Sequence, residues 1–503
     1  MRQEAYLGLD IGGTGAKAGV VDKRGRLLAI AHRPYQPQLM NDGRVEIPIE
    51  TIYSAAHQAA VSAVRESGAR IVALSIASQG QTFVSLDEHD ESLYPAIIWY
   101  DARAVEQANR LTQALHSSHL AEAKPCVNPI ATGPKIMWLG ERFPGLMARA
   151  KRYLLLPDYL TYRLTGRAVT DPCTASTTGL YAVDAPDYCA EALAAAGIEK
   201  GQIAEIQPTG RPVGKVTKKI VEEWELDSEC LVVTGSNDQY AGALGAGNCR
   251  PGIVSVTTGT CLSLVTLTEH LPHPIPPGLL VGRFPIPRYQ FGLAYSKTAG
   301  VVLEWFNREM SPGSSLSEYD EMARNVPPGS RGVVMLPYFD GMISPVTDPA
   351  ARGAFLNLAL HHTRADLYRA MLEALGFTLL ECLELFRQCG FSTEVVRAIG
   401  GGAKSDIWLQ IGADITGLSI ERPVIPESAI LGAAMIAAVG MGAFSSLEEC
   451  SGTFSQCARV FHPDPANHVT YAKLSRIYNE LYRHIYHHDR ALKDAGRSNY
   501  QGK

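Results

Sequence analysis

Near its N-terminus the chain reads Tyr6-Leu7-Gly8-Leu9-Asp10-Ile11-Gly12-Gly13-Thr14-Gly15, a short apolar segment followed by a glycine-rich turn. The apolar residues predict a buried strand, and a second strand over 16–21 is expected to complete a hairpin. A third strand over 27–31, a helix over 51–66 and a strand over 71–76 follow along the sequence. The stretch therefore predicts the order β-β-β-α-β at the start of an α/β domain.

A second hairpin of the same kind begins near residue 250. The strand 253–256 enters the turn Thr258-Gly259-Thr260, and the strand 262–265 leaves it. We interpret this repeat as an internal duplication, and the length of 503 residues also exceeds what one hydrophobic core usually organises. We therefore predict two lobes, 1–250 and 251–503.

Two helices are predicted in the second half of the chain. The stretch 363–387 carries apolar residues at helical spacing, and Thr363 with Asp366 three residues later is typical of a capping box. The second helix is expected to begin at Ser428 with a hydroxyl cap and to end at Gly440 with a glycine cap. Both are predicted to be mostly core.

The composition favours a small molecule as the partner. Hydrophobic residues make up 46% and charged residues 19% of a chain whose formal net charge is -5, so no basic field favours a nucleic acid. The N-terminus lacks a secretory signal and no apolar run spans a bilayer, so we expect a cytoplasmic protein without a membrane partner. The ten cysteines form no Cys-x-x-Cys pair, which favours reduced thiols.

Asp10 and the glycines that follow it form a candidate corner for phosphate and metal. Glycines let the backbone approach an anion closely, and a carboxylate beside a triphosphate favours Mg²⁺. Thr14 and Lys17 could donate hydrogen bonds to phosphate oxygens. The alternative is an ordinary glycine turn, and the spacing does not match a Walker A motif.

Two further segments could carry chemistry. The strand at 232–236 leads to Asp238 and Gln239, where a carboxylate could accept the proton of an attacking sugar hydroxyl, although Asp238 could instead be a helix N-cap. The run Ile399 to Asp406 contains three successive glycines and could lie flat against an adenosine, or be only a strand-to-helix connection.

The ordered motifs resemble those of the FGGY carbohydrate kinases over nearly the whole chain. The matching segments are Leu9 to Thr14, Trp99 to Arg103, Gly235 to Gln239, Gly259-Thr260, Asp348 to Gly353, Gly400 to Asp406 and Ala429 to Ala434. The resemblance implies an α/β fold of two ribonuclease-H-like lobes of the actin and hexokinase superfamily, with a nucleotide cleft between them. It also implies an ATP-dependent carbohydrate kinase that uses Mg²⁺, and it is compatible with a homodimer.

The resemblance also implies a role for each matching residue. Asp238 would be the general base and Asp10 the metal residue. The acceptor would meet Gln81, Trp99, Asp238 and Gln239, whereas the nucleotide and its phosphates would meet Thr14, Lys17, Gly259, Thr260, Gly300, Gly401, Gly402, Ala403 and Asp406. An indole suits a sugar site because its face covers C–H groups, although Trp99 could also be a core residue.

The acceptor is less well defined by the sequence. Gly80-Gln81 replaces the Arg-Glu pair of glycerol kinases, the Gln-Met-His-Gly of xylulokinases is absent, and Ile130 stands where glycerol kinases have a tyrosine. The segments 78–83 and 236–240 contain no lysine or arginine, so a neutral acceptor is expected. We expect a ketopentose such as xylulose, phosphorylated at a primary hydroxyl. The alternatives are a short polyol (erythritol, xylitol or glycerol), gluconate and autoinducer-2.

Two other classes of function share this superfamily or fold. An actin- or chaperone-like ATPase would couple its nucleotide cycle to a partner, but no peptide-binding domain follows the two lobes. A sugar-binding regulator would be expected to lose a catalytic carboxylate, whereas Asp10 and Asp238 are both present. The kinase is therefore the favoured hypothesis.

Overall fold

The computed structural model describes residues 2–117, 125–183, 185–310, 313 and 315–488, which fold into two compact units. The first unit comprises Met1–Cys249 together with Gly282–Gln290 and Glu427–Gln456. The second unit comprises Arg250–Val281, Phe291–Pro426 and Cys457–Lys503. The proposed boundary near 250 marks the first crossing of the chain, which later returns twice to the first unit.

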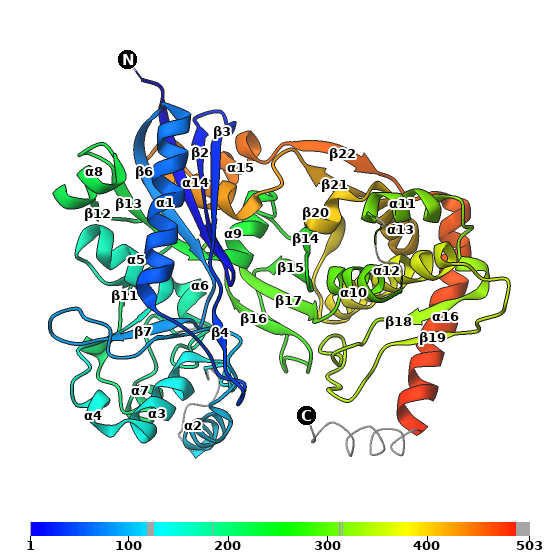
Figure 1. Ribbon diagram of the computed structural model, residues 1–503, viewed down its shortest axis with the longest axis horizontal. Helices are drawn as coiled ribbons and strands as arrows, with labels where there is room; N and C mark the ends of the chain where they lie inside the picture. The colour runs from blue at the N-terminus through cyan, green and yellow to red at the C-terminus, as the bar shows by residue number, and fades with distance from the viewer. Residues whose placement is uncertain (1, 118–124, 184, 311–312, 314, 489–503) are drawn as a thin grey trace. The chain divides into compact units, whose positions relative to one another are not determined.

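A six-stranded sheet forms the centre of the first unit (Figure 1). Its strands, in spatial order, are β12 (Pro212–Lys215), β13 (Leu231–Asn237), β6 (Arg70–Ser78), β1 (Glu4–Ile11), β2 (Gly15–Asp22) and β3 (Leu27–Pro34). The strands β1, β2 and β3 are antiparallel neighbours, whereas β6 is parallel to β1 and β13 is parallel to β6. The predicted order β-β-β-α-β is confirmed, with two short additional strands before the helix.

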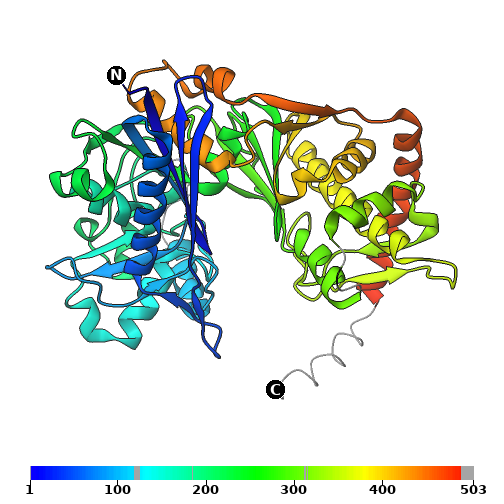
Figure 2. The same cartoon turned by 45° about the horizontal axis from the view of Figure 1, so that its top comes forward.

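Helices cover both faces of this sheet. Helix α1 (Ile49–Ser67) lies along β2 and β3, as Figures 1 and 2 show, and ends at Gly68 in the left-handed conformation. Helix α14 (Ser428–Gly440) packs on β1 and β6 and on α9 (Asp238–Gly245). At Gly432 a Cβ would lie 1.9 Å from the carbonyl oxygen of Ala241, so only a glycine permits this approach.

A second sheet and several helices extend the first unit. The sheet contains β4 (Gln38–Leu39), β5 (Val45–Ile47), β8 (Ala96–Ile97), β7 (Phe83–Leu86) and β9 (Arg152–Leu155), and β10 (Val169–Thr170) pairs with β11 (Glu205–Ile206). The helices are α2 (Val105–Ser117), α3 (Thr132–Arg142), α4 (Pro144–Met147), α5 (Leu156–Thr165), α6 (Pro172–Ala175), α7 (Ala190–Ala196), α8 (Lys218–Trp224) and α15 (Leu447–Phe454).

The second unit repeats the strand order of the first. Its sheet runs β16 (Leu280–Arg283), β17 (Gln290–Ser296), β15 (Leu262–Thr268), β14 (Gly252–Thr258), β20 (Thr393–Gly400), β21 (Ile420–Pro423) and β22 (Cys457–Phe461). As in the first unit, a hairpin is followed by two parallel strands, because β14 is antiparallel to β15 and β20 is parallel to both β14 and β21. The interpretation as an internal duplication agrees with this topology.

Helices and a small hairpin complete the second unit. They are α10 (Gly300–Met310), α11 (Leu316–Arg324), α12 (Arg364–Gln388), α13 (Asp406–Thr416), α16 (Pro465–His488), β18 (Val334–Leu336) and β19 (Ala354–Leu356). The predicted capping box of Thr363 and Asp366 is present at the start of α12. The bounds predicted for α14 are confirmed, but its caps are wrong: Glu427 precedes it without a side-chain hydrogen bond, and Met441 follows it.

Within the described part of the chain, no helix is long and apolar enough to cross a membrane.

Candidate functional site

Three polar residues lie at the carboxyl ends of three neighbouring parallel strands in the first unit. Asp10 is near the end of β1, Gln79 directly follows β6 and Asp238 directly follows β13. The register places these ends at one level, because Ser78 of β6 lies opposite both Ile11 of β1 and Asn237 of β13. Ligands bind at this edge in open α/β sheets.

Asp238 is the first residue of α9. The N-cap is Asn237, whose side chain accepts a hydrogen bond of 3.0 Å from the backbone N–H of Gln239, so the alternative of Asp238 as an N-cap is wrong. Burial and the negative charge of Asp10 raise the pKa of Asp238 to about 7. A carboxyl group with this pKa can exchange a proton near neutral pH.

Asp10 lies opposite Lys17 in the β1–β2 pair, so the two side chains share one face of the sheet. Burial raises the pKa of Asp10, and the charge of Lys17 partly opposes this effect. The turn between the strands is closed by a hydrogen bond of 3.1 Å from Gly12 N to the Gly15 oxygen, and Thr14 is exposed at its tip. The backbone N–H of Tyr35 donates to the Thr14 oxygen at 3.0 Å.

The predicted acceptor residues are also in the first unit. Gln81 has a φ of 56°, a conformation rare outside glycine and often found at functional sites. Trp99 is 38% exposed and meets Tyr100 edge-on at 5.3 Å between ring centroids, so the alternative of a core tryptophan is wrong. The Oε1 of Gln239 is buried and has no hydrogen-bond partner within the described residues.

Gln79 is a candidate residue that the sequence reasoning missed. It is 2% exposed, and neither its Nε2 nor its Oε1 has a hydrogen-bond partner among the residues that the structure describes. Its amide lies beside the glycine turn: a Cβ on Gly13 would be 3.7 Å from Gln79 Oε1 and 3.5 Å from Trp99 Nε1. A buried amide of this kind costs free energy unless a ligand or water satisfies it. In the sequence, only its place directly after a predicted strand could have indicated that Gln79 belongs to the site.

Arg103 is fully engaged in ion pairs. Its guanidinium binds Asp101 through Nε at 2.9 Å and NH2 at 2.6 Å, and Glu46 through NH1 at 2.7 Å. The side chain is 4% exposed and stacks on Trp138. The charge of Arg103 is therefore already neutralised by two carboxylates.

A buried lysine supports the segment that carries Trp99. Lys135 is 0% exposed and its Nζ donates to the carbonyl oxygen of Ile98 at 3.1 Å. Burial lowers the pKa of Lys135 to about 7, although the charge of Asp101 partly opposes this. The contact fixes the backbone immediately before the indole.

In the second unit, the turn between β14 and β15 packs against the start of α10. Gly259 accepts a hydrogen bond of 2.8 Å from the N–H of Gly300, and the Thr260 oxygen accepts one of 2.9 Å from Ala299. A Cβ on Gly300 would lie 2.5 Å from the Gly259 oxygen. The structure thus brings Gly259, Thr260 and Gly300 together, and their contact with a nucleotide stays a prediction.

The glycine run at 400–402 ends β20 and packs on the same turn. Gly400 has a φ of 84°, and a Cβ on Gly402 would lie 2.6 Å from Thr258 Oγ1, so bare backbone is required at both positions. A 3-10 turn (Gly401–Lys404) with a buried Ala403 then leads to α13.

Asp406, the first residue of α13, is held by two arginines. Its carboxylate pairs with Arg422 at 2.8 Å and with Arg459. Arg422 also donates to the Ala403 oxygen at 3.1 Å, so the same ion pairs fix the end of the glycine run.

Comparison with known proteins extends over nearly the whole chain. The N-terminal domain model of the FGGY family of carbohydrate kinases matches residues 5–245, and the C-terminal domain model matches residues 254–441. A xylulose kinase from Bacillus subtilis (strain 168) is 29% identical over 492 residues, covering 97% of this chain and 98% of that protein. An autoinducer-2 kinase from Salmonella paratyphi B is 27% identical over 515 residues, covering 97% and 95%.

The fold agrees with these matches. The crystal structure of a xylulose kinase from Rhodospirillum rubrum has a TM-score of 0.87 at 26% identity, covering 96% of this chain and all of that one. The two-unit α/β architecture and the repeated strand order are those expected of the actin and hexokinase superfamily. The chain belongs to the FGGY family of carbohydrate kinases, and it is an ATP-dependent phosphotransferase that acts on small sugars.

Proposed function

We propose that this kinase transfers the γ-phosphate of Mg-ATP to a primary hydroxyl of a small neutral ketopentose such as xylulose, with Asp238 as the general base. The observation that carries this proposal is the carboxyl of Asp238, whose pKa of about 7 is matched to proton transfer at neutral pH. Xylulose kinases among the relatives support the choice of acceptor.

The base is positioned by the packing beneath it. The buried residues Tyr240 to Gly245 of α9 are mostly small and let α14 approach closely, and Asn237 caps the first turn. Asp238 is therefore held at the end of β13 by backbone structure and not by a flexible loop. In this position its carboxylate can take the hydroxyl proton as the acceptor oxygen attacks phosphorus.

Asp10 fits a magnesium ion only with the help of the nucleotide. No group of three or more His, Cys, Asp and Glu side chains that could hold a metal occurs within the described ranges. Mg²⁺ usually takes one or two carboxylates and completes its shell with phosphate oxygens and water. When bound with ATP the ion neutralises phosphate charge, and Asp10 would hold it while Lys17 and Thr14 bind phosphate oxygens.

The second unit supplies the residues that suit the nucleotide. Gly259, Gly300, Gly401 and Gly402 leave backbone uncovered by side chains, and Thr260 is exposed next to Gly259. Such surfaces bind phosphates and adenosine closely. We propose that these residues bind the nucleotide, with Asp406 contributing through the ion pairs that hold the glycine run.

Unpaired amides support a neutral acceptor with several hydroxyl groups. Gln79 and Gln239 carry buried polar atoms without partners within the described residues, and each amide offers both a donor and an acceptor. Trp99 is partly exposed and, like Gln79, lies close to Gly13, and an indole face suits C–H groups. Arg103 cannot serve a carboxylate substrate because Asp101 and Glu46 already occupy its guanidinium.

Steady-state kinetics on a panel of acceptors test the proposal. The panel contains xylulose, ribulose, erythritol, xylitol, glycerol, gluconate and autoinducer-2, each with Mg-ATP. We expect the highest kcat/KM for a ketopentose, and ATP hydrolysis without any acceptor should be slow. The highest kcat/KM for gluconate, glycerol or autoinducer-2 would reject the proposed acceptor, and acceptor-independent ATP turnover would reject the kinase mechanism.

A further inference from the structure

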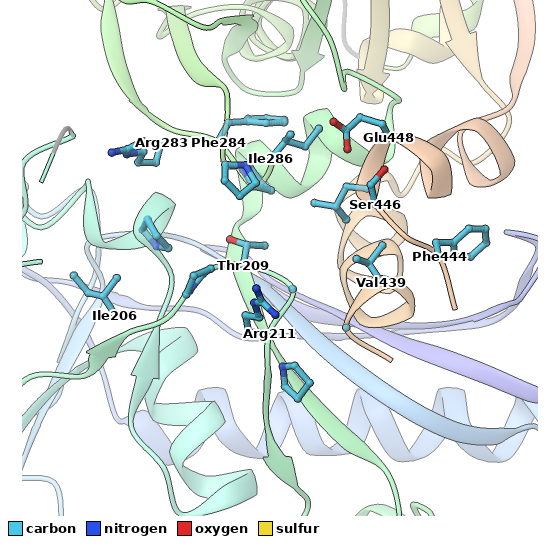
Figure 3. Close-up of a pocket in the computed structure, with 18 of the residues that line it drawn as sticks. Ile206, Thr209, Arg211, Arg283, Phe284, Ile286, Val439, Phe444, Ser446 and Glu448 are labelled. Atoms are coloured by element: carbon cyan, nitrogen blue, oxygen red, sulfur yellow. The ribbon is translucent and has the colours of Figure 1, made fainter. Parts of the chain in front are cut away.

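A large cavity lies entirely within the first unit and away from the catalytic residues. Its volume is about 920 Å³, within the usual range for small-molecule pockets. It is lined by residues between Pro172 and Pro186, by the segment from Ile206 to Pro212, by the segment 283–287, and by the stretch from Val439 at the end of α14 to Glu448 at the start of α15 (Figure 3). Asp10, Gln79, Gln81, Trp99 and Asp238 are not among its lining residues.

The lining segments include the two later returns of the chain to this unit. The segment 282–290 enters from Val281 and leaves at Phe291, both of which belong to the second unit. The end of α14 and the start of α15 lie inside the other return, 427–456. A ligand here would therefore contact both later returns of the chain, each of which is joined covalently to the second unit at its two ends.

The charges around the cavity are unbalanced. Its charged lining residues are Arg211, Arg283 and Glu448. Glu448 forms an ion pair with Arg288 at 2.9 Å, whereas neither Arg211 nor Arg283 has a side-chain partner within the described part of the chain. Arg211 is exposed and Arg283 is half-buried. The cavity therefore presents two available guanidinium groups.

The remaining walls are mainly apolar. Proline, aliphatic and aromatic side chains predominate, and Phe284, Ile286, Val439 and Phe444 are among those visible in Figure 3. Arginine binds phosphate and carboxylate oxygens in a bidentate manner, and an apolar wall favours a ligand body that is poorly hydrated. Neither inorganic ions nor neutral apolar molecules would use both features.

We propose that this cavity is a binding site for a small organic anion, a phosphate or carboxylate group attached to a body with apolar faces, separate from the kinase site. Arg211 or Arg283 would bind the anionic group, because Figure 3 shows their guanidinium groups at separate places around the cavity, and the apolar walls formed by 284–286 and the end of α14 would hold the body. The site does not depend on the acceptor or on ATP, so this proposal can be tested separately from the proposed function.

Phenyl phosphate is a suitable probe because it combines a dianion with an apolar ring. Isothermal titration calorimetry would be performed on the full chain with Mg-ADP at saturation, so that the catalytic phosphate site is occupied. Inorganic phosphate measures the binding of the charged part of the probe alone, and benzyl alcohol measures the binding of the apolar part alone. We expect phenyl phosphate to bind at least about tenfold more tightly than either.

Charge variants identify the site. The Arg211→Gln/Arg283→Gln double variant should weaken phenyl phosphate binding about tenfold or more, since it removes the charged hydrogen bond, and the two single variants identify the guanidinium that the phosphate uses. Arg24→Gln, which removes an exposed arginine of the same unit away from the cavity, should leave binding unchanged. Val439→Trp should block binding by filling the cavity while both arginines remain.

Kinase activity distinguishes this site from the catalytic one. Without phenyl phosphate, kcat/KM of the two arginine variants should equal that of the wild type. Equal phenyl phosphate affinity in the Arg211→Gln/Arg283→Gln double variant, equal affinity for inorganic phosphate, or no binding at about 10 mM phenyl phosphate would each overturn the proposal.

Discussion

Lowering the pH below 7 should inactivate the enzyme mainly through one carboxyl group, that of Asp238. Because burial and Asp10 raise its pKa to about 7, about one tenth of the molecules carry the carboxylate at pH 6 and about nine tenths at pH 8. If the carboxylate is the general base, kcat/KM should rise about tenfold between these values. An ordinary aspartate would leave the rate flat over this range.

The same pKa predicts how Asp238 affects stability. The folded-state pKa lies above the value of about 3.9 for an unfolded chain, so the fold favours the protonated form. The stabilising contribution is complete below about pH 4 and is lost as the pH rises through 7. Between pH 5 and pH 8 the wild type should lose up to about 3 kcal/mol relative to Asp238→Asn, an upper bound because solvent reaches the half-buried carboxyl.

The assay combines kinetics with thermal unfolding. The wild type and Asp238→Asn would be compared from pH 5 to pH 9 with the best acceptor at constant ionic strength and saturating Mg-ATP. The variant should lose about 10²- to 10⁴-fold in kcat, and its kcat/KM should no longer fall as the pH is lowered below 7. At pH 8 it should melt at a higher temperature than the wild type. Asp42→Asn, in an exposed loop, is the matched control and should preserve the wild-type profile.

Two results would refute the reasoning on Asp238. A variant with near-normal kcat would exclude it as the base. The second result has two parts: kcat/KM of the wild type falls only near pH 4, and the variant is no more stable than the wild type at pH 8. Together they would show that the carboxyl of Asp238 is not held in the environment described.

Three other substitutions test the remaining parts of the site. Asp10→Asn should raise the Mg²⁺ concentration needed for half-maximal activity while leaving the acceptor affinity unchanged, and an unaltered Mg²⁺ dependence would exclude a metal role. Gln79→Leu should raise the acceptor KM about tenfold without lowering the melting temperature, since it removes an unsatisfied buried amide; a lower melting temperature with an unchanged KM would indicate a structural role. Gly432→Ala should destabilise the protein by about 1–3 kcal/mol because its Cβ would overlap the Ala241 oxygen, whereas Gly201→Ala, which meets no atom within 4 Å, should be neutral; equal melting temperatures would contradict the close packing of α14.

Local patterns in the sequence were sufficient for much of the fold. The apolar strand that contains Leu7 to Asp10 and the capping box at Thr363 depend on residues close together in the chain, and both were predicted correctly. The return of α14 to the first unit was not predicted. It depends on the contact of Gly8 with Ile430 and of Gly432 with Ala241, and the sequence contains no local record of such long-range pairs.

The candidate site shows the same distinction. Asp10 and Asp238 follow recognisable apolar strands, so their position at strand ends could be predicted from the sequence alone. Gln79 stands out only through the absence of hydrogen-bond partners, and the engagement of Arg103 only through its contacts with Asp101 and Glu46. These are properties of the tertiary environment and not of residue spacing.

The electrostatics of the first unit explain why a neutral acceptor is favoured more strongly than the sequence indicated. The absence of lysine and arginine from two segments showed only that a cation was missing there. In the structure, the carboxylates of Asp10 and Asp238 interact strongly enough for the charge of Asp10 to raise the pKa of Asp238. Lys17 is opposite Asp10 and partly offsets that single charge. An acidic acceptor would add a third negative charge beside these carboxylates, and it would further raise the pKa of Asp238 and so reduce the fraction of active base at neutral pH. We therefore expect an acidic acceptor to be disfavoured both in binding and in the proton transfer itself.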